Sequence, residues 1–331
     1  MRTPRFSQAL VATLLAGMTR VLAASPEGGG TAPPSPQGDH RAGQGQEAGP
    51  SVALTFDDLP VHANLPPGMS RADVARSVLA TLKAHHAPPT YGFVNAKGLD
   101  GGPDTAEVLR LWRASGNPLA NHSFSHMDLN ANSVEAFEKD VLADEAVLRA
   151  EMSGADWHFF RYPFLHEGDT LLKRRAVRSF LSDHGYKVAQ VTLNFDDYAY
   201  NDPYARCVAA SDATAVEDLK ESYLRRAKES LAAGQEAAKR IFGRDIPHVM
   251  LLHIGAFETV MLPQLLDLLE QSGFRLSTLG QVETDPAYSV DPGEAALGGG
   301  PFLSQMMAAK HIPQPETTTP QELSRIGQLC R

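Results

Sequence analysis

The chain of 331 residues is long enough for one large domain or two small ones, and 43% hydrophobic with 21% charged residues is the composition of a globular protein. Its formal net charge of −9 argues against a protein that binds nucleic acid or another polyanion. The two cysteines, Cys207 and Cys330, lack the CxxC spacing of a sulfur-bound metal site, and the sequence leaves open whether they form a disulfide.

Residues 1–24 have the pattern of a secretory signal peptide. Positive charge at Arg2 and Arg5 precedes a short apolar core at 9–17, and the small residues at 21–23 suit a cleavage site. The apolar core is too short to span a bilayer, so we expect no stable membrane span in the mature chain. The segment predicts an exported protein that is periplasmic, bound to the cell envelope or extracellular. The alternative is a disordered N-terminal tail.

The rest of the chain divides by composition into three parts. Residues 25–50 are rich in Gly and Pro and predict a flexible linker. Residues 51–290 carry the regular patterning and predict a single large domain. Residues 291–331 begin with another Gly- and Pro-rich stretch and predict a peripheral C-terminal tail.

Short apolar runs typical of strands alternate with amphipathic segments typical of helices from Ser51 onward. The expected strands are 51–56, 90–94, 118–120, 157–160, 187–193, 248–253 and 274–276. The expected helices are 70–86, 104–115, one that begins at an N-cap Asn132, 170–184, 213–242 and 259–272. This alternation predicts an α/β fold with a mainly parallel sheet, and the number of units favours a distorted or incomplete (β/α) TIM-type barrel. An open doubly wound sheet is the alternative, although no GxGxxG follows the first strand.

The stretch LTFDDLP places two carboxylates, Asp57 and Asp58, directly after the first strand. Neighbouring side chains in a strand point to opposite faces, so both acids cannot serve one site from within a regular ladder. We therefore expect the strand to stop here with the two carboxylates fanned out at its end.

Polar residues follow four other predicted strands in the same way. They are His122 and His126 in NHSFSH, Arg161 in FRYPF, Asp196 and Asp197 in LNFDDY, and His253 in VMLLH. The carboxyl ends of the strands of a parallel barrel share one face, where active sites form. The sequence therefore predicts that distant segments deliver acids, imidazoles and a guanidinium to one cleft.

The pair His122 and His126 has the spacing of two metal ligands. Four residues apart on a helical turn, two imidazoles lie on one side, and two histidines with one carboxylate are a common ligand set for Zn²⁺ or another first-row metal. The alternative is a histidine near a helix cap and another on the surface.

Five motifs in this order resemble the polysaccharide deacetylases of carbohydrate esterase family 4. They are TFDD, HSFSH, the Arg-containing RYPF, the acidic DDY and LLH, spread from Ser51 to about Asp285. The resemblance implies a distorted (β/α) barrel with one divalent metal, which we expect to be Zn, with Co or another first-row metal as alternatives. It also implies hydrolysis of an N-acetyl, or in some relatives O-acetyl, group on a carbohydrate polymer or oligomer.

The resemblance also implies roles for the residues that match the motifs. Asp58, His122 and His126 would hold the metal. Asp57 would be the general base that activates the hydrolytic water, and Arg161 would orient Asp57 and keep it ionised.

The remaining implied roles concern the leaving group and the oxyanion. His253 would be the general acid that protonates the departing amine, held by Asp197, although the neighbouring Asp196 stays an alternative for that role. The backbone N–H at about Phe164 would help to stabilise the oxyanion, and Tyr198 would supply an aromatic wall.

Three positions depart from the family pattern and leave the identity of the substrate open. Leu59 stands where the family has Gly, Tyr162 where it has Pro, and Asn194 where it has Asp. Two other functions stay open beside a secreted deacetylase that acts on peptidoglycan, chitin-like oligomers or exopolysaccharide. One is a metal-dependent amidohydrolase on a small non-sugar amide. The other is a non-catalytic sugar-binding module, which would be expected to lack a ligand or the base, whereas this chain keeps all of them.

Overall fold

The computed structural model describes residues 49–331 except 103, 296–298 and 315–319. The predicted signal peptide and residues 25–48 of the predicted linker lie outside the described residues, so both stay predictions. In the described ranges, none of the helices combines the length and the apolar character that a membrane span requires.

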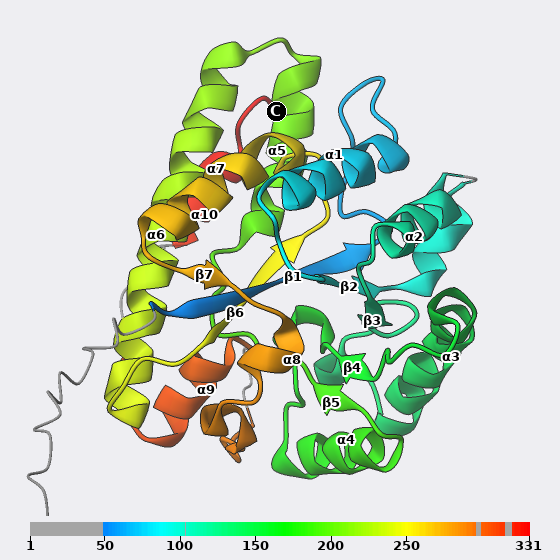
Figure 1. The fold of residues 1–331 in the computed structure, drawn as a ribbon, viewed down its shortest axis with the longest axis vertical. Coiled ribbons are helices and arrows are strands. Elements are labelled where there is room, and N and C mark those ends of the chain that lie inside the picture. Colours follow the sequence, from blue (N-terminus) through cyan, green and yellow to red (C-terminus); the bar gives the residue numbers. More distant parts are fainter. Residues whose placement is uncertain (1–48, 103, 296–298, 315–319) are drawn as a thin grey trace, which may run out of the picture. The chain divides into compact units, whose positions relative to one another are not determined.

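A parallel sheet forms the centre of the described part of the chain (Figure 1). Its strands are β1 (Ser51–Leu59), β2 (Tyr91–Val94), β3 (Leu119–Asn121), β4 (Phe159–Phe160), β5 (Lys187–Val188), β6 (His248–His253) and β7 (Arg275–Leu276). Their order is β5-β4-β3-β2-β1-β6, and β7 pairs with the beginning of β1. Because β1 lies between β2 and β6, the residues that follow it stand near the middle of the row of strand ends.

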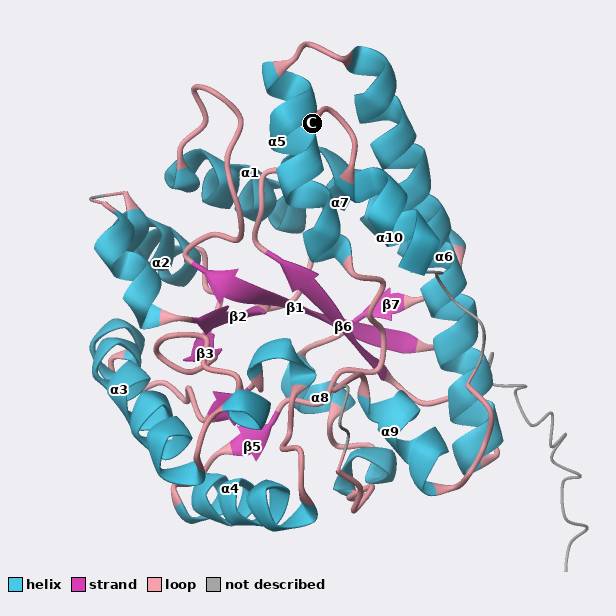
Figure 2. Ribbon diagram, turned by 180° about the vertical axis from the view of Figure 1, so that it is seen from behind, coloured by secondary structure: helices cyan, strands magenta, loops and turns pink. Residues whose placement is uncertain are grey.

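Helices pack side by side around this sheet (Figures 1 and 2). Their bounds are α1 (Arg71–Ala84), α2 (Thr105–Ala114), α3 (Val134–Met152), α4 (Leu171–Asp183), α5 (Asn201–Ala209), α6 (Ala213–Phe242), α7 (Glu258–Gln271), α8 (Leu279–Val282), α9 (Phe302–Ala309) and α10 (Pro320–Gly327). Neighbouring helices are in contact in the order α4, α3, α2, α1, α7, α6 and α9. The helices therefore cover the outer face of the sheet as in a (β/α) barrel.

Strand β1 shows how the sequence fills both faces of the sheet. Val52, Leu54 and Phe56 join the large hydrophobic cluster under the outer helices, whereas Ala53 joins a smaller cluster that also contains residues of α8. A strand whose alternate residues are both buried is expected in a parallel sheet covered on both faces. Thr55 and Asp57 share the face of Ala53, so they point into the barrel.

The predicted strand at 187–193 is interrupted, and this interruption distorts the barrel. Its first part follows β4, where the N–H of Ala189 donates to Phe160 O at 2.8 Å. Its last part follows β6, where Leu193 forms an isolated parallel bridge with Met250. One segment thus pairs with a different strand at each end, and the prediction of a distorted or incomplete (β/α) TIM-type barrel is confirmed.

Helix boundaries agree closely with the sequence except at the start of α3. Ser70 forms a capping box with Asp73 at the start of α1, and α6 has the predicted bounds. The predicted N-cap Asn132 is wrong, because the Ser133 hydroxyl accepts the hydrogen bond from Ala136 N–H. The side-chain amide of Asn132 instead donates to the backbone oxygen of Asp128.

The C-terminal segment is fastened to the barrel at two places. Cys330 forms a disulfide with Cys207 of α5, which answers the question that the sequence left open. Helix α9 buries Phe302, Leu303 and Met306 against α6. The division of the chain at 291 stays a prediction, but α9 packs against the helices that surround the sheet.

Candidate active site

A bulge at the end of β1 separates the two adjacent carboxylates. The strand continues to Leu59, so the prediction that it stops after Phe56 is wrong. Its register against β2 shifts between Phe56 and Leu59, and Asp58 adopts a left-handed backbone conformation with φ 64°. The extra residue redirects Asp58 while Asp57 keeps its place opposite His253 of β6. The bulge therefore points the two carboxylates in different directions, as a strand end was expected to do.

Asp58 and the two histidines of the NHSFSH motif form a group that can hold a metal ion. Asp58 Oδ1 lies 3.6 Å from His122 Nε2 and 3.5 Å from His126 Nε2, and the three ligand atoms all lie within 4.8 Å of one another. Asp58 Oδ1 is buried without a hydrogen-bond partner among the described residues. A buried oxygen that lacks a partner beside two imidazole nitrogens fits a divalent cation.

The local backbone and the protonation of His122 also suit a ligand. His122 Nδ1 bonds to the backbone oxygen of Arg161 at 2.8 Å, which orients Nε2 toward Asp58. Burial lowers the pKa of His122 to about 3, so the ring is neutral, as a metal ligand must be. The prediction that the histidine pair lies on a helical turn is wrong, because Ser123 and His126 have φ values of 60° and 56° and the motif forms a loop.

Asp57 is held by a buried arginine. Arg161 Nη1 lies 3.2 Å from Asp57 Oδ1, its Nη2 donates to Thr55, and its Nε donates to the backbone oxygen of Ala189. Burial raises the pKa of Asp57 to about 6, although the charge of Arg161 opposes the increase. Asp57 is therefore an oriented carboxylate whose pKa lies near neutrality, as a general base requires.

Asp197 and His253 form a second carboxylate pair of the site, in which the Asp197 side chain is fully buried. Asp197 Oδ1 lies 2.9 Å from His253 Nδ1, and its Oδ2 accepts the His253 backbone N–H at 2.6 Å. Burial lowers the pKa of His253, but the Asp197 carboxylate outweighs this effect and raises it to about 9. The neighbouring Asp196 instead binds Arg226 Nη2 at 2.7 Å. The structure thus places Asp197, not Asp196, on the imidazole.

The two aromatic residues singled out from the sequence are both exposed beside these groups. Phe164 is 56% exposed and its ring lies 4.4 Å from that of His126, while Tyr198 is 42% exposed and its ring lies 5.5 Å from that of His253. Both side chains line the pocket, so their open faces can contact a ligand that enters it. Their roles toward a substrate stay predictions.

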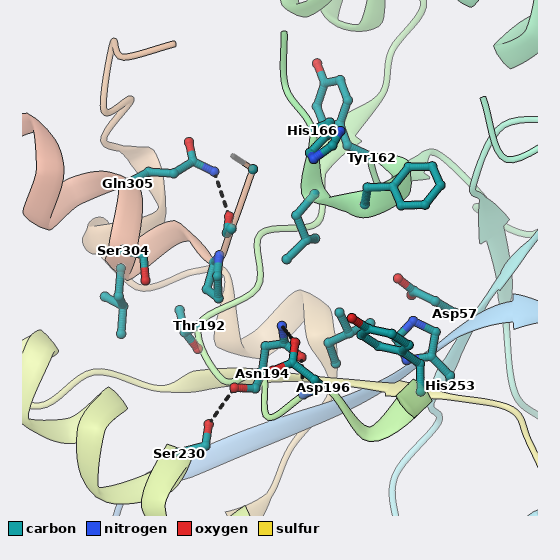
Figure 3. Close-up of a pocket in the computed structure, with 18 of the residues that line it drawn as sticks. Asp57, Tyr162, His166, Thr192, Asn194, Asp196, Ser230, His253, Ser304 and Gln305 are labelled. Carbon is teal, nitrogen blue, oxygen red and sulfur yellow. Dashed lines mark hydrogen bonds between the residues drawn. The ribbon is translucent and has the colours of Figure 1, made fainter. Parts of the chain in front are cut away.

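One pocket of about 920 Å³ brings the predicted site residues together (Figure 3). Its lining includes Asp57, Asp58, His122, His126, Phe164, Tyr198 and His253, whereas Arg161 and Asp197 are outside the lining and contact Asp57 and His253. The sequence did not predict the far wall, where Ser230 belongs to α6 and Ser304 and Gln305 belong to α9. Two further histidines, His62 and His166, also line the pocket, as the sequence suggests for a loop at its rim and for the segment after Arg161. Their only signal in the sequence is position, since each follows a motif residue by four or five places, whereas α9 carries no signal of its own.

Comparison with known proteins finds one family model and several deacetylases that resemble this chain. Residues 44–189 match the family model described as polysaccharide deacetylase. A chitooligosaccharide deacetylase of Sinorhizobium fredii is 29% identical over 135 residues, which are 41% of this chain and 56% of that protein. A chitin deacetylase of Arthroderma benhamiae is 24% identical over 236 residues, which are 71% of this chain and 52% of that protein.

These matches cover only part of each protein. The chain spans about half the length of the curated relatives it matches. The solved chitin deacetylase of Colletotrichum lindemuthianum is 22% identical, with a TM-score of 0.48 over 71% of this chain and 88% of that one. Residues 44–189 match the family model of the polysaccharide deacetylases, and the resemblance that the motifs indicate is confirmed. The matched part contains Asp57, Asp58, His122, His126 and Arg161.

Proposed function

We propose that this chain is a metal-dependent hydrolase that removes acetyl groups, principally N-acetyl groups, from an oligomeric or polymeric carbohydrate. The family match and the names of the two deacetylase relatives support this reaction class. The observation that carries the proposal is the meeting of three units at one pocket: the Asp57–Arg161 pair, the ligand set of Asp58 with two histidines, and the Asp197–His253 pair.

Each unit has a distinct task in amide hydrolysis. A divalent cation such as Zn²⁺, when held by Asp58, His122 and His126, supplies Lewis acidity that activates water and polarises a carbonyl. Asp57 accepts the proton of the attacking water, since Arg161 fixes its carboxylate and the group is an acceptor at neutral pH. His253 keeps a proton on its ring at neutral pH and donates it to the departing nitrogen.

A carbohydrate is a better substrate class for this pocket than a small amide. Phe164 and Tyr198 are exposed aromatic side chains whose rings lie beside those of His126 and His253. Pyranose rings stack on such faces through their apolar C–H groups, while their hydroxyls need the polar side chains found along the far wall. A small non-sugar amide would use neither feature.

We further propose that the protein is exported to the periplasm, the cell envelope or the extracellular space. The disulfide between Cys207 and Cys330 supports this proposal, because disulfides persist in oxidising compartments. Fractionation of the native host, with determination of the N-terminus of the mature protein, tests it. A cytosolic protein that still begins at Met1 would contradict it.

Acetate release from N-acetylglucosamine oligomers by the full chain tests the proposed reaction. The protein is stripped with a chelator, then assayed with and without added Zn²⁺ or Co²⁺, beside the Asp57→Asn variant. We expect release that needs the metal and falls by at least about a hundredfold in the variant. A small acetamide serves as the competing substrate. Faster hydrolysis of that amide than of the oligomers would favour the amidohydrolase alternative.

A further inference from the structure

A second pair of a carboxylate and an imidazole lies on the pocket wall, outside the groups assigned above. His166 Nδ1 is 2.8 Å from Asp128 Oδ1, and His166 lines the same pocket as Asp57 and His253 (Figure 3). The His166 side chain is 23% exposed and that of Asp128 is 28% exposed. His166 is therefore open to a ligand that enters the pocket, and Asp128 contacts it from outside the lining.

The ring of His166 is fixed on both sides. The Phe164 ring lies 5.6 Å from it, and the backbone at Gly299 passes directly beside it. A Cβ at position 299 would collide with the imidazole and would stand 3.1 Å from Nε2. Gly299 also has φ +66°, a conformation that side-chain-bearing residues rarely adopt. Glycine at this position lets the backbone pass beside the Cδ2 and Nε2 edge of the ring without a clash.

The contact with Asp128 decides which hydrogen bond His166 can offer. In the tautomer that this contact selects, Nδ1 donates its proton to the carboxylate and Nε2 carries the lone pair that accepts a hydrogen bond. No residue that the structure describes donates to this nitrogen. An oriented acceptor beside the exposed face of Phe164 combines the two contacts that a sugar ring needs, a hydroxyl partner and an aromatic face.

The position of His166 along the pocket selects which sugar it contacts. The Phe164 ring contacts the rings of both His126 and His166, with centroids 4.4 Å and 5.6 Å away. One aromatic side chain therefore links the candidate metal ligands to His166. A sugar whose acetyl group reaches the ligand set stands on the His126 side, and its neighbour in the oligomer reaches His166.

We propose that His166, oriented by Asp128, is a substrate-positioning residue that accepts a hydrogen bond from a hydroxyl of the sugar next to the one being deacetylated. The inference rests on the proposed function, because it takes the carbohydrate as the substrate. It predicts that the site prefers oligomers to the monosaccharide and that His166 is the origin of part of this preference.

Two measurements on the full chain test the role of His166. The first compares KM and kcat for the N-acetylglucosamine trimer with kcat/KM for a small acetyl ester that has no neighbouring sugar. His166→Ala should raise KM for the trimer about tenfold, the effect of one lost hydrogen bond, and leave kcat within about threefold. The preference for the trimer over the ester should fall by a similar factor. The second measurement is calorimetric binding of the trimer to Asp57→Asn, with and without His166→Ala.

Matched variants separate positioning from a general loss of structure. His166→Gln keeps an amide near the place of Nε2 and should recover part of the lost affinity. His158→Ala removes an imidazole that contacts a carboxylate in the same way, Nδ1 to Asp156 Oδ1 at 3.0 Å, but lies outside this pocket. It should leave KM for the trimer unchanged.

The outcomes distinguish failure of this inference from failure of the proposed function. If the unchanged protein releases acetate and His166→Ala has the same KM as His158→Ala, the inference is overturned and the function stands. If the protein releases no acetate but binds the trimer about tenfold more weakly without His166, the function fails and the sugar contact is supported. If the protein neither binds nor hydrolyses the trimer, both are overturned.

Discussion

Two carboxylate–imidazole pairs of this pocket have nearly the same hydrogen-bond length but different surroundings. The Nδ1 to Oδ1 distance is 2.9 Å for His253 with Asp197 and 2.8 Å for His166 with Asp128. The Asp197 side chain is fully buried and that of His253 is 12% exposed, whereas the exposed fractions of the second pair are 28% and 23%. Distance alone therefore does not assign a role, and burial separates the two pairs.

The carboxylates also differ in their second contact. Asp197 gives its other oxygen to the backbone N–H of His253, so both of its oxygens bind one residue. Asp128 Oδ1 also accepts the backbone N–H of Asn130 and caps the turn that follows. Water screens a charge at an exposed site far more than at a buried one. The buried pair is suited to keep a proton on the imidazole for catalysis, and the exposed pair is suited to orient an imidazole for binding.

The largest effect is expected when a residue of the metal-ligand group is removed, because both carboxylate–imidazole pairs act in a reaction that needs the metal. Asp58→Ala should remove bound divalent metal and lower kcat by at least about a thousandfold, since Lewis-acid activation contributes several kcal/mol. Metal analysis after dialysis, together with acetate release, measures both effects. His62→Ala is the control: His62 Nε2 lies 3.9 Å from Asp58 Oδ2 but is outside the ligand group, so this variant should keep its metal.

The next largest effect distinguishes Asp197 from Asp128 by the kcat and KM of their variants. Asp197→Asn should lower kcat about a hundredfold, as expected for the loss of a poised general acid, whereas Asp128→Asn should raise KM and leave kcat within about threefold. Because Asp197 raises the pKa of His253 to about 9, activity should fall as the pH rises through 9, and this limb should move to lower pH in Asp197→Asn. Equal losses of kcat in the two variants would contradict the comparison.

Stability should separate the pairs as well. The folded pKa of His253 lies above its ordinary value of 6.5, so the pair stabilises the fold fully below pH 6.5 and loses this contribution as the pH rises through about 9. We expect the unfolding free energy to fall by about 2 kcal/mol more in the unchanged protein than in Asp197→Asn between about pH 6 and about pH 10. Urea unfolding at both values measures this difference, and Asp128→Asn should behave as the unchanged protein does.

Much of the fold could be predicted from the sequence because its elements are locally consistent. Strand β6 and helix α6 have the predicted bounds, since their apolar runs and charge patterns need no knowledge of distant contacts. The segment 187–193 was predicted as one strand because its local pattern is that of a strand. Only the pairing of its two ends with β4 and β6 interrupts it, and pairing over such distances in the chain leaves no local signal.

The candidate site divides in the same way. The barrel rule brings the residues that follow the strands to one pocket, as expected for Asp57, His122 and His253. Two adjacent carboxylates that serve one site show that the regular strand is broken, but not whether it ends or forms a bulge. The sequence therefore did not predict the bulge at Asp58. The wall formed by α9 could not be predicted, because residues 291–331 were expected as a peripheral tail and no local pattern shows which surface a segment packs against.

The smallest effect concerns the acid beside Asp197 and tests whether the buried pair is specific. Asp196 lies in a left-handed conformation with φ 57° and binds Arg226, and asparagine tolerates that backbone as well as aspartate does. Asp196→Asn should therefore keep kcat within about threefold and leave the pH limb of His253 in place, while weakening a salt bridge and lowering the melting temperature by a few degrees. Activity measured across pH 7 to about 10 and thermal unfolding report the two effects separately. The two adjacent carboxylates would then have different roles because their partners differ: an imidazole for Asp197 and a guanidinium for Asp196. If Asp196→Asn moved the pH limb as far as Asp197→Asn does, both carboxylates together would raise the pKa of His253, and the comparison would be wrong.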